Sequence, residues 1–288
     1  MRLCRTREDM RTAVRSFRAE GAFVGLVPTM GYLHEGHMEL VRRARAGCDR
    51  VVVSIFVNPA QFGPAEDLAT YPRNEERDLR LLKDAGVDAV FLPEAGEMYR
   101  PGAQTVVEVK NLSRILMGRL RPGHFRGVTT VVAKLFNIVT PDRAYFGEKD
   151  YQQLQVIRRM VEDLDYGIDI VGVPTRRAPD GLALSSRNVR LSAEDRAAAT
   201  ILNRALNEAE EHARTGPSAA ALRTMLRDRI KSEPRADPRS VDIRDAETLA
   251  PVRGPLARPA VILLAVRFGD VLLIDQRVVT PQGEPDEH

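Results

Sequence analysis

One stretch without a polar face, residues 50–57, most constrains the fold of this chain. It is nearly all apolar and rich in β-branched residues, as is typical of a strand covered on both faces of a parallel sheet. A second apolar run, residues 22–27, precedes it, and Leu40, Val41 and Ala44 between them follow helical spacing. Strands that alternate with helices predict right-handed crossovers and an α/β domain with a doubly wound, Rossmann-like parallel sheet.

The remaining elements of this domain follow from the same patterns. We expect strands at residues 2–4, 89–92, 105–109, 143–146 and 169–173, and helices at residues 6–20, 75–85, 128–139 and 147–163. The segment 119–127 is expected to be a basic loop. Residues 128–139 contain so many β-branched side chains that a strand is the alternative.

The chain changes character near residue 175. Residues 174–188 are polar and rich in turn formers. Ser192 with Asp195 resembles a capping box that opens a long helix to about residue 214, and a second helix is expected at 218–231. Apolar runs at residues 241–244, 260–267 and 271–275 predict strands. We therefore expect one domain over residues 1–175, a smaller α+β domain over residues 176–280, and a disordered tail over residues 281–288.

Composition and charge exclude several classes of protein. The 288 residues are 43% hydrophobic and 29% charged, which is typical of a soluble globular protein. A net charge of +3 argues against a dedicated nucleic-acid binder. The N-terminal 20 residues lack the apolar core of a signal peptide, and the longest apolar run, 260–266, is too short to span a bilayer. Cys4 and Cys48 lack metal-type spacing, and the pair predicts reduced thiols in the cytoplasm.

The decapeptide at residues 28–37 lies where an apolar strand gives way to an amphipathic helix. A helix N-terminus offers unpaired N–H groups and a positive dipole end, which favour an anion. Gly31 and Gly36 allow a close approach of the backbone, and His34 and His37 share one helical face. We hypothesise a phosphate-binding site for a nucleotide here. The alternative is one capping and one packed histidine.

Three further segments suit ligands, and each also has a plain structural explanation. Residues 147–150 form another strand-to-helix turn, where Lys149 suits a phosphate or merely charges a first helical turn. Residues 183–188 combine two hydroxyls with a guanidinium, which suits a diphosphate or a solvated loop. Asn58 and Gln61 follow a strand, where amides suit substrate hydroxyls and carboxylates or cap a loop. We expect all four segments to meet along the carboxyl edge of one sheet.

Six segments together resemble the pantothenate synthetase family. They are Pro28-Thr29-Met30-Gly31 with Leu33-His34-Glu35-Gly36-His37, Phe56-Val57-Asn58-Pro59 with Gln61-Phe62, Tyr71-Pro72-Arg73, His124-Phe125-Arg126-Gly127-Val128, Phe146-Gly147-Glu148-Lys149-Asp150-Tyr151-Gln152-Gln153, and Asp180-Gly181 with Ser185-Ser186-Arg187-Asn188. The resemblance implies a ligase of the His-x-Gly-His nucleotidyltransferase superfamily. It would join (R)-pantoate to β-alanine through pantoyl adenylate, using ATP and releasing AMP and diphosphate.

The resemblance also implies roles for individual residues. His37, His34 and Lys149 would be catalytic. ATP would contact Met30, Gly31, His34, His37, Gly147, Lys149, Asp150, Arg176, Leu184, Ser185, Ser186 and Arg187. Pantoate would contact Gln61, Gln153 and Asn58, with Gln61 also beside β-alanine. Mg²⁺ would bridge the phosphates, with no ligand assigned. The family further implies a cytoplasmic homodimer whose second domain is a lid.

Three positions depart from the family pattern. Arg176 replaces a small apolar residue and Leu184 replaces a methionine. Tyr32 replaces a small residue, and its side chain either crowds the turn or points outward.

Two other functions are alternatives. An adenylyltransferase with another acceptor is the first, and the two amides of Gln61 and Gln153 argue against it. A nucleotide-binding regulatory protein is the second, and the complete set of basic side chains argues against it.

Overall fold

A computed structural model of the chain describes residues 1–63 and 68–281. By its internal contacts the chain divides into two compact units. The first comprises Met1–Glu148 and Gln153–Pro174, and the second comprises Lys149–Gln152 and Thr175–His288. The tail expected over residues 281–288 lies, from residue 282 onward, outside the described residues.

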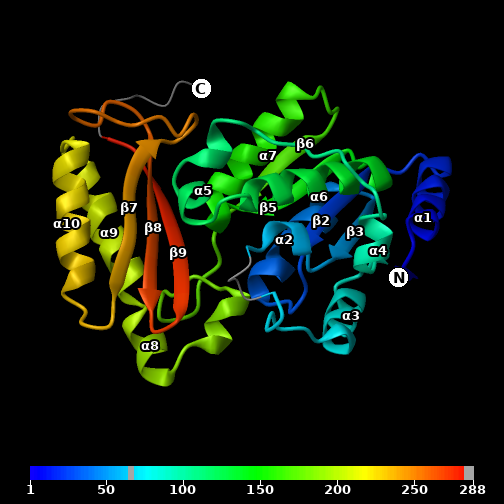
Figure 1. Cartoon of the computed structure of the whole chain (residues 1–288), viewed down its shortest axis with the longest axis horizontal. Coiled ribbons are helices and arrows are strands. Elements are labelled where there is room, and N and C mark those ends of the chain that lie inside the picture. Colours follow the sequence, from blue (N-terminus) through cyan, green and yellow to red (C-terminus); the bar gives the residue numbers. More distant parts are fainter. Residues whose placement is uncertain (64–67, 282–288) are drawn as a thin grey trace. The chain divides into compact units, whose positions relative to one another are not determined.

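The first unit contains a six-stranded parallel sheet with the strand order β1-β4-β3-β2-β5-β6. Strands β2, β3, β5 and β6 of this sheet are labelled in Figure 1. The strands are β1 (Arg2–Cys4), β2 (Val24–Thr29), β3 (Arg50–Ile55), β4 (Ala89–Phe91), β5 (Arg143–Gly147) and β6 (Asp169–Val173). The order reverses between β2 and β5, because β3 and β4 continue on one side and β6 on the other. Open sheets of this kind bind ligands beyond the strand ends next to such a reversal.

Both faces of this sheet are covered by helices, which explains the absence of a polar side in residues 50–57. Along β3, Val52 points into one core, whereas Val51 and Val53 point into the other. The helices of the first face are α1 (Arg7–Ala19), α6 (His124–Val139) and α7 (Tyr151–Asp163). Those of the second face are α2 (Glu35–Gly47) and α3 (Glu75–Asp84) (Figure 1). Short helices α4 (Ala95–Met98) and α5 (Met117–Leu120) lie in the connections.

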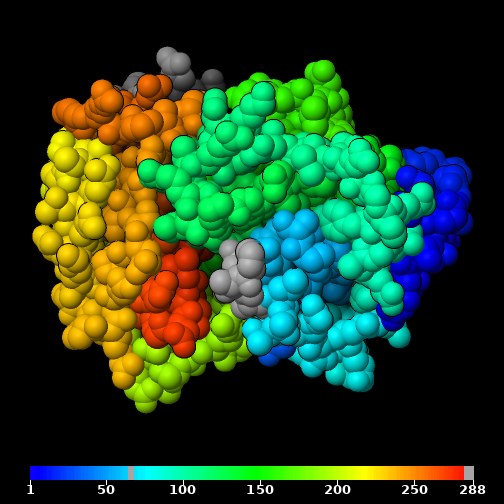
Figure 2. Space-filling view, viewed as in Figure 1, coloured from blue at the N-terminus to red at the C-terminus, as the bar shows by residue number. Residues whose placement is uncertain are grey.

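The second unit has a three-stranded antiparallel sheet in the order β7-β8-β9. Its strands are β7 (Asp237–Asp245), β8 (Ala260–Phe268) and β9 (Val271–Val279), the last two joined by a tight turn as expected. The apolar sides of α8 (Ala193–Ala198), α9 (Ile201–Ala213) and α10 (Ala219–Lys231) form one core with this sheet. The outer side of α10 forms the yellow surface in Figure 2. An α/β sheet with a smaller α+β unit is the fold class expected from the sequence.

Two expected elements are wrong because side chains and local geometry override the apolar pattern. Residues 105–109 form no strand, since the Val107 N–H donates to Thr130 Oγ1 at 3.0 Å and the Val107 carbonyl accepts from Thr129 Oγ1 at 2.6 Å. The long helix expected after Ser192 is two helices, α8 and α9. Between them the Thr200 N–H bonds the Ala197 carbonyl three residues back, in the tighter 3-10 manner.

Several expected boundaries also move. Strand β7 begins four residues earlier than expected, β9 ends four residues later, and α7 begins at Tyr151 rather than residue 147. The basic loop predicted at 119–127 instead contains the end of α5 and the first residues of α6, which begins at His124 behind Gly123. Gly123 has a φ of 83°, a conformation that glycine adopts without strain. Strand β2 begins at Val24 rather than residue 22, because the Ala22 N–H still bonds the Phe17 carbonyl at the end of α1.

Gly127 allows α6 to lie directly against the short 3-10 helix η1 (Pro59–Gln61). A Cβ atom at Gly127 would lie 2.2 Å from the Ala60 carbonyl oxygen and 2.6 Å from Gln61 Cα. These are backbone atoms, which move less readily than the end of a flexible side chain. The approach therefore places the segment after β3 at a fixed distance from α6.

We expect Gly127→Ala to destabilise the protein by about 1–3 kcal/mol, because α6 and η1 must separate to admit the methyl group. Urea unfolding at equilibrium measures the change. Gly96→Ala in α4 is the matched control, since an added Cβ there meets nothing within 4 Å and is expected to leave stability unchanged or slightly higher. Equal stability of the two variants would contradict the packing argument.

Candidate functional site

The turn after β2 is held by a buried carboxylate from α3. The Asp78 side chain, 1% exposed, accepts hydrogen bonds from the Tyr32 N–H at 2.6 Å and the Leu33 N–H at 2.8 Å. Burial raises the pKa of Asp78, while the two backbone hydrogen bonds oppose that rise. Gly31, with a φ of 80°, is enclosed by Ile55 and Asp78, so a side chain there would be crowded as well as strained. The Asp78 hydrogen bonds and the close packing at Gly31 therefore fix the conformation of this turn.

Tyr32, which departs from the family pattern, has a φ of 50° in this turn. Its ring lies 5.6 Å from the Arg77 guanidinium carbon, in a cation–π contact. Arg77 in turn donates to the Leu33 carbonyl at 2.9 Å. The tyrosine is therefore engaged with α3, and it joins the set of contacts that supports the turn.

The two histidines form a reciprocal cap at the N-terminus of α2. His34 is the N-cap and its Nδ1 accepts from the Gly36 N–H at 3.1 Å, while His37 Nδ1 accepts from the His34 N–H at 3.3 Å. The ring centroids lie 4.0 Å apart. Because each Nδ1 accepts from a backbone amide, the neutral rings carry their protons on Nε2. The capping alternative and the functional hypothesis are therefore compatible, since the cap itself sets both tautomers.

The segment after β3 contains a chain of buried amides. Asn58, 1% exposed, donates from Nδ2 to Gln61 Oε1 and to the Gly127 carbonyl, each at 3.1 Å. Gln61, 8% exposed, donates from Nε2 to Met30 Sδ at 3.0 Å. Met30 and Gln61, predicted to contact different ligands, are thus adjacent. The Asn58 amide donates to other groups of the protein, so it orients Gln61 and agrees with the loop-capping alternative.

Two residues to which the sequence assigned no role support these amides. The Tyr99 hydroxyl donates to Asn58 Oδ1 at 2.8 Å, and burial raises the pKa of Tyr99 to about 12. His124 Nδ1 lies 2.9 Å from the Gln61 carbonyl, which can only accept, so Nδ1 carries a proton. The neutral His124 ring therefore has the opposite tautomer to His34 and His37. Its Nε2 lies 3.3 Å from Arg121 Nη1.

The segment after β5 is shared between the two units. Gly147 ends β5 in the first unit, next to β2 in the sheet, and Gln153 lies half-buried in the first turns of α7. Lys149 and Asp150 belong to the second unit, and Lys149 Nζ lies 4.0 Å from Asp150 Oδ2. The Lys149 side chain is 17% exposed and that of Asp150 is 50% exposed.

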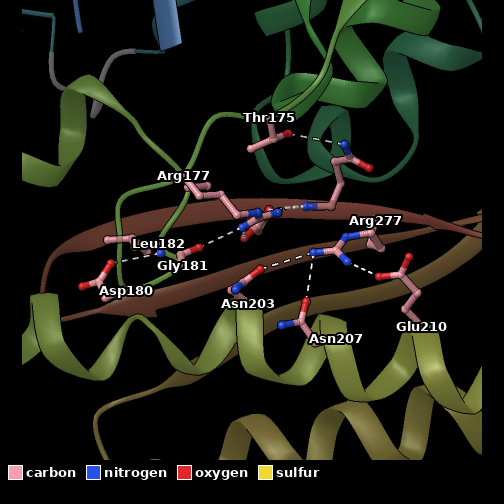
Figure 3. A network of polar contacts seen from close by, with 12 residues as sticks. Thr175, Arg177, Asp180, Gly181, Leu182, Asn203, Asn207, Glu210 and Arg277 are labelled. Atoms are coloured by element: carbon pink, nitrogen blue, oxygen red, sulfur yellow. Dashed lines mark hydrogen bonds and ion pairs between the residues drawn. The ribbon is translucent and has the colours of Figure 1, made fainter. Parts of the chain in front are cut away.

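The polar loop of the second unit begins as a small hairpin (Figure 3). The Leu184 N–H donates to the Arg176 carbonyl at 3.0 Å, so the two positions that depart from the family pattern pair through their backbones. Ser185 then caps the 3-10 helix η4 (Ser186–Arg190) by accepting from the Arg187 N–H at 3.3 Å. Asn188 Nδ2 returns to the Ala183 carbonyl at 3.0 Å. Ser186 is 7% exposed.

Three of the four expected segments follow neighbouring parallel strands, namely β3, β2 and β5, so their strand ends lie along one edge of the sheet. Within the first unit the structure brings Met30 to Gln61 and His34 to His37. Of the other predicted residues, Gly31, Asn58, Gly147 and Gln153 lie in the first unit, and those in the second unit are Lys149, Asp150, Arg176, Leu184, Ser185, Ser186 and Arg187. Their ligand contacts stay predictions.

Asp78 is the main supporting residue that the sequence prediction missed. It lies in a helix first turn among exposed charged residues, where acidic side chains are ordinary. One signal was present: Asp78 precedes buried Leu82 by four residues, which places both on one helical face. Tyr99 and His124 offered no comparable signal, because their partners lie 41 and 63 residues away.

Two features are absent from the part of the chain that the structure describes. Every helix within residues 1–63 and 68–281 is too short or too polar to cross a membrane. In the same residues no group of three or more His, Cys, Asp or Glu side chains could hold a metal ion. Cys4 and Cys48 are both free thiols.

Comparisons with known proteins agree with this geometry. A family model described as pantoate-beta-alanine ligase matches residues 2–278. The pantothenate synthetase of Bartonella tribocorum is 55% identical over 98% of this chain and 99% of its own, and that of Rhizobium meliloti is 54% identical over 98% of each.

Solved structures extend the match to the fold. A pantothenate synthetase from Thermus thermophilus superposes with a TM-score of 0.92 and 49% identity, covering 96% of this chain and 99% of its own. A pantoate-beta-alanine ligase from Francisella tularensis, complexed with beta-gamma ATP and beta-alanine, gives a TM-score of 0.80 and 33% identity over 96% and 97%. These matches confirm the resemblance, the fold class and the ligase class expected from the sequence, and they show that the chain belongs to the pantoate–β-alanine ligase family.

Proposed function

We propose that the chain condenses (R)-pantoate with β-alanine in two steps. The pantoate carboxylate attacks the α-phosphorus of ATP, which forms pantoyl adenylate and releases diphosphate. The β-alanine amine then attacks the acyl carbon, which forms pantothenate and releases AMP. One observation carries the proposal most directly: a histidine pair caps a helix just beyond β2, beside the reversal of strand order, and Met30, directly after β2, accepts a hydrogen bond from the buried amide of Gln61.

Phosphate binding is supported by the α2 N-terminus. The two Nδ1 atoms accept backbone N–H groups, so the Nε2–H group of each ring is the ring donor that a phosphate oxygen requires. Donors held by the backbone do not reorganise when charge develops on the phosphate. Lys149, Ser185, Ser186 and Arg187 supply further donors from the second unit, and Met30, Gly31, Gly147, Asp150 and the backbones of Arg176 and Leu184 line the nucleotide.

Pantoate recognition is assigned to Gln61 and Gln153. Both ends of the Gln61 side-chain amide are oriented, by Asn58 at Oε1 and by Met30 at Nε2. The backbone carbonyl of Gln61 is held by His124. A fixed amide can distinguish a hydroxy acid from an acid without the hydroxyl, since a missing partner leaves a buried polar group unpaired. We assign Asn58 an indirect role through Gln61, and β-alanine a place beside Gln61.

Mg²⁺ fits this arrangement as an ion that accompanies the triphosphate. Such ions are ordinarily held by one or two carboxylates together with phosphate oxygens and water. The half-exposed Asp150 carboxylate beside Lys149 suits that role. When bound, the ion supplies neutralisation of phosphate charge.

The proposed reaction predicts AMP release that depends on pantoate. We expect purified protein with ATP, Mg²⁺, pantoate and β-alanine to form AMP and pantothenate in equal amounts, measured by chromatography. Omitting pantoate should abolish AMP formation, and chelating Mg²⁺ should suppress it. AMP formation that does not depend on pantoate would contradict the proposed ligase. Release of diphosphate without AMP would indicate an adenylyltransferase, and ATP binding without turnover would indicate a binding protein.

His37→Ala is expected to lower turnover by about 10²-fold, the scale of losing one preorganised donor to a developing charge. The lost cap should reduce stability by about 0.5–2 kcal/mol, so the protein remains folded. Turnover and urea unfolding measure the two effects. His212→Ala, at an exposed position of α9, is the matched control. Full activity of His37→Ala would exclude the assigned role.

We further propose that residues 1–175 bind ATP and pantoate, that residues 176–280 act as a lid, and that the enzyme is a cytoplasmic homodimer. The free thiols and the family membership support this assignment. Small-angle X-ray scattering tests the assembly and the lid together. We expect a mass about twice 32.1 kDa and a smaller radius of gyration with ATP and pantoate, since closure excludes water from the adenylate. A monomer mass would contradict the homodimer. Identical scattering curves with and without ligands would contradict the lid.

A further inference from the structure

A buried ion pair in the second unit connects the polar loop to the sheet. Arg177 Nη1 donates to Asp275 Oδ2 at 2.7 Å, and Arg177 Nη2 donates to Asp275 Oδ1 at 2.9 Å (Figure 3). The Asp275 side chain is 1% exposed and that of Arg177 is 18% exposed. Two parallel hydrogen bonds from one guanidinium define its orientation as well as its position. Arg177 lies in the hairpin before the loop, and Asp275 lies in β9.

The same guanidinium also fixes the turn of the hairpin. Arg177 Nη1 donates to the Gly181 carbonyl at 3.2 Å. Gly181 has a φ of 91° and lies against Asn203, so this turn has little room to change conformation. Asp180, beside it, is paired with Arg196 of α8 at 2.7 Å and accepts from the Leu182 N–H at 3.2 Å. The hairpin is thus held from β9 and from α8.

The hairpin leads directly into the loop proposed to contact the triphosphate. Ala183, opposite Arg177 in the hairpin ladder, offers its carbonyl to Asn188. Ser185, Ser186 and Arg187 lie between these two anchored residues. Displacing Arg177 therefore displaces both ends of the loop through the backbone pairing, although Arg177 is assigned no ligand.

We propose that Arg177 and Asp275 are positioning residues for the adenylation step, and that they act by holding the Ser185-Ser186-Arg187 loop in one conformation. The inference rests on the proposed function, since the loop matters through the triphosphate that it binds. It predicts that the pair affects formation of pantoyl adenylate much more than its use. The first step requires the triphosphate donors, whereas the second releases AMP after diphosphate has left.

The variants distinguish the effect of losing a charge from the effect of losing the bidentate geometry. Arg177→Gln and Asp275→Asn each leave one buried charge uncompensated, whereas the double variant leaves neither. Arg177→Lys keeps the charge and loses the bidentate geometry. Arg277→Gln is the matched control: Arg277 lies on the same strand and pairs with Glu210, Asn203 and Asn207 of α9 rather than with the hairpin (Figure 3).

The two half-reactions are measured separately in the full-length protein. Pantoate-dependent exchange of labelled diphosphate into ATP reports the first, and reaction of β-alanine with supplied pantoyl adenylate reports the second. We expect Arg177→Gln and Asp275→Asn to lower kcat/KM for ATP in exchange by about 10²-fold, the cost of a misplacement of about 1 Å, and to change the second reaction less than about threefold. The kcat/KM of Arg177→Lys for ATP in exchange should lie between the values of these variants and that of the unmodified protein.

The double variant addresses folding and coupling together. It should be no slower in exchange than the slower single variant, because both changes release the same loop. Equal loss of both half-reactions, an equal loss in Arg277→Gln, or a folded double variant with full exchange would each overturn the inference. Absence of exchange in the unmodified protein would instead overturn the proposed function, so the two failures are distinguishable.

Discussion

Strands covered on both faces can present ligand-binding groups only at their ends. In this chain β2, β3 and β5 carry apolar residues toward two cores, and three of the four segments assigned to ligands follow those strands. The reversal of strand order between β2 and β5 prevents the adjoining crossover connections from covering that edge. The location of the candidate site is therefore a consequence of how the sheet excludes water, before any catalytic side chain is considered.

At that edge, and separately within the second unit, buried polar groups are oriented by other buried polar groups. Asp78 holds the turn below the histidines, Asn58 and Tyr99 hold Gln61, and Asp275 holds Arg177 at the hairpin of the second unit. Each contact satisfies a group that burial would otherwise penalise, and it also removes conformational freedom from a segment that carries residues assigned to a ligand. Stability and preorganisation therefore depend on the same hydrogen bonds.

The sequence prediction succeeded where the cause is local and failed where it is not. The helix expected at residues 6–20 is α1, which begins at a local cap of Thr6 and Asp9. The helix expected at residues 128–139 lies within α6. Residues 105–109 were misread as a strand because their backbone partners, Thr129 and Thr130, are side chains about 22 residues away. The break before Ile201 was missed because hydrogen bonds three residues back leave the apolar spacing almost unchanged.

By itself the sequence determined the doubly wound sheet and the segments that follow its strands, because apolar period and glycine-rich turns act over short distances. The family was indicated by the resemblance of six segments. Tertiary structure decided which atoms face one another. It set the tautomer of His124, opposite to that of His34 and His37, and the bidentate pair between Arg177 and Asp275. These depend on partners brought together by folding, and no pattern along the chain encodes a hydrogen bond between residues 98 positions apart.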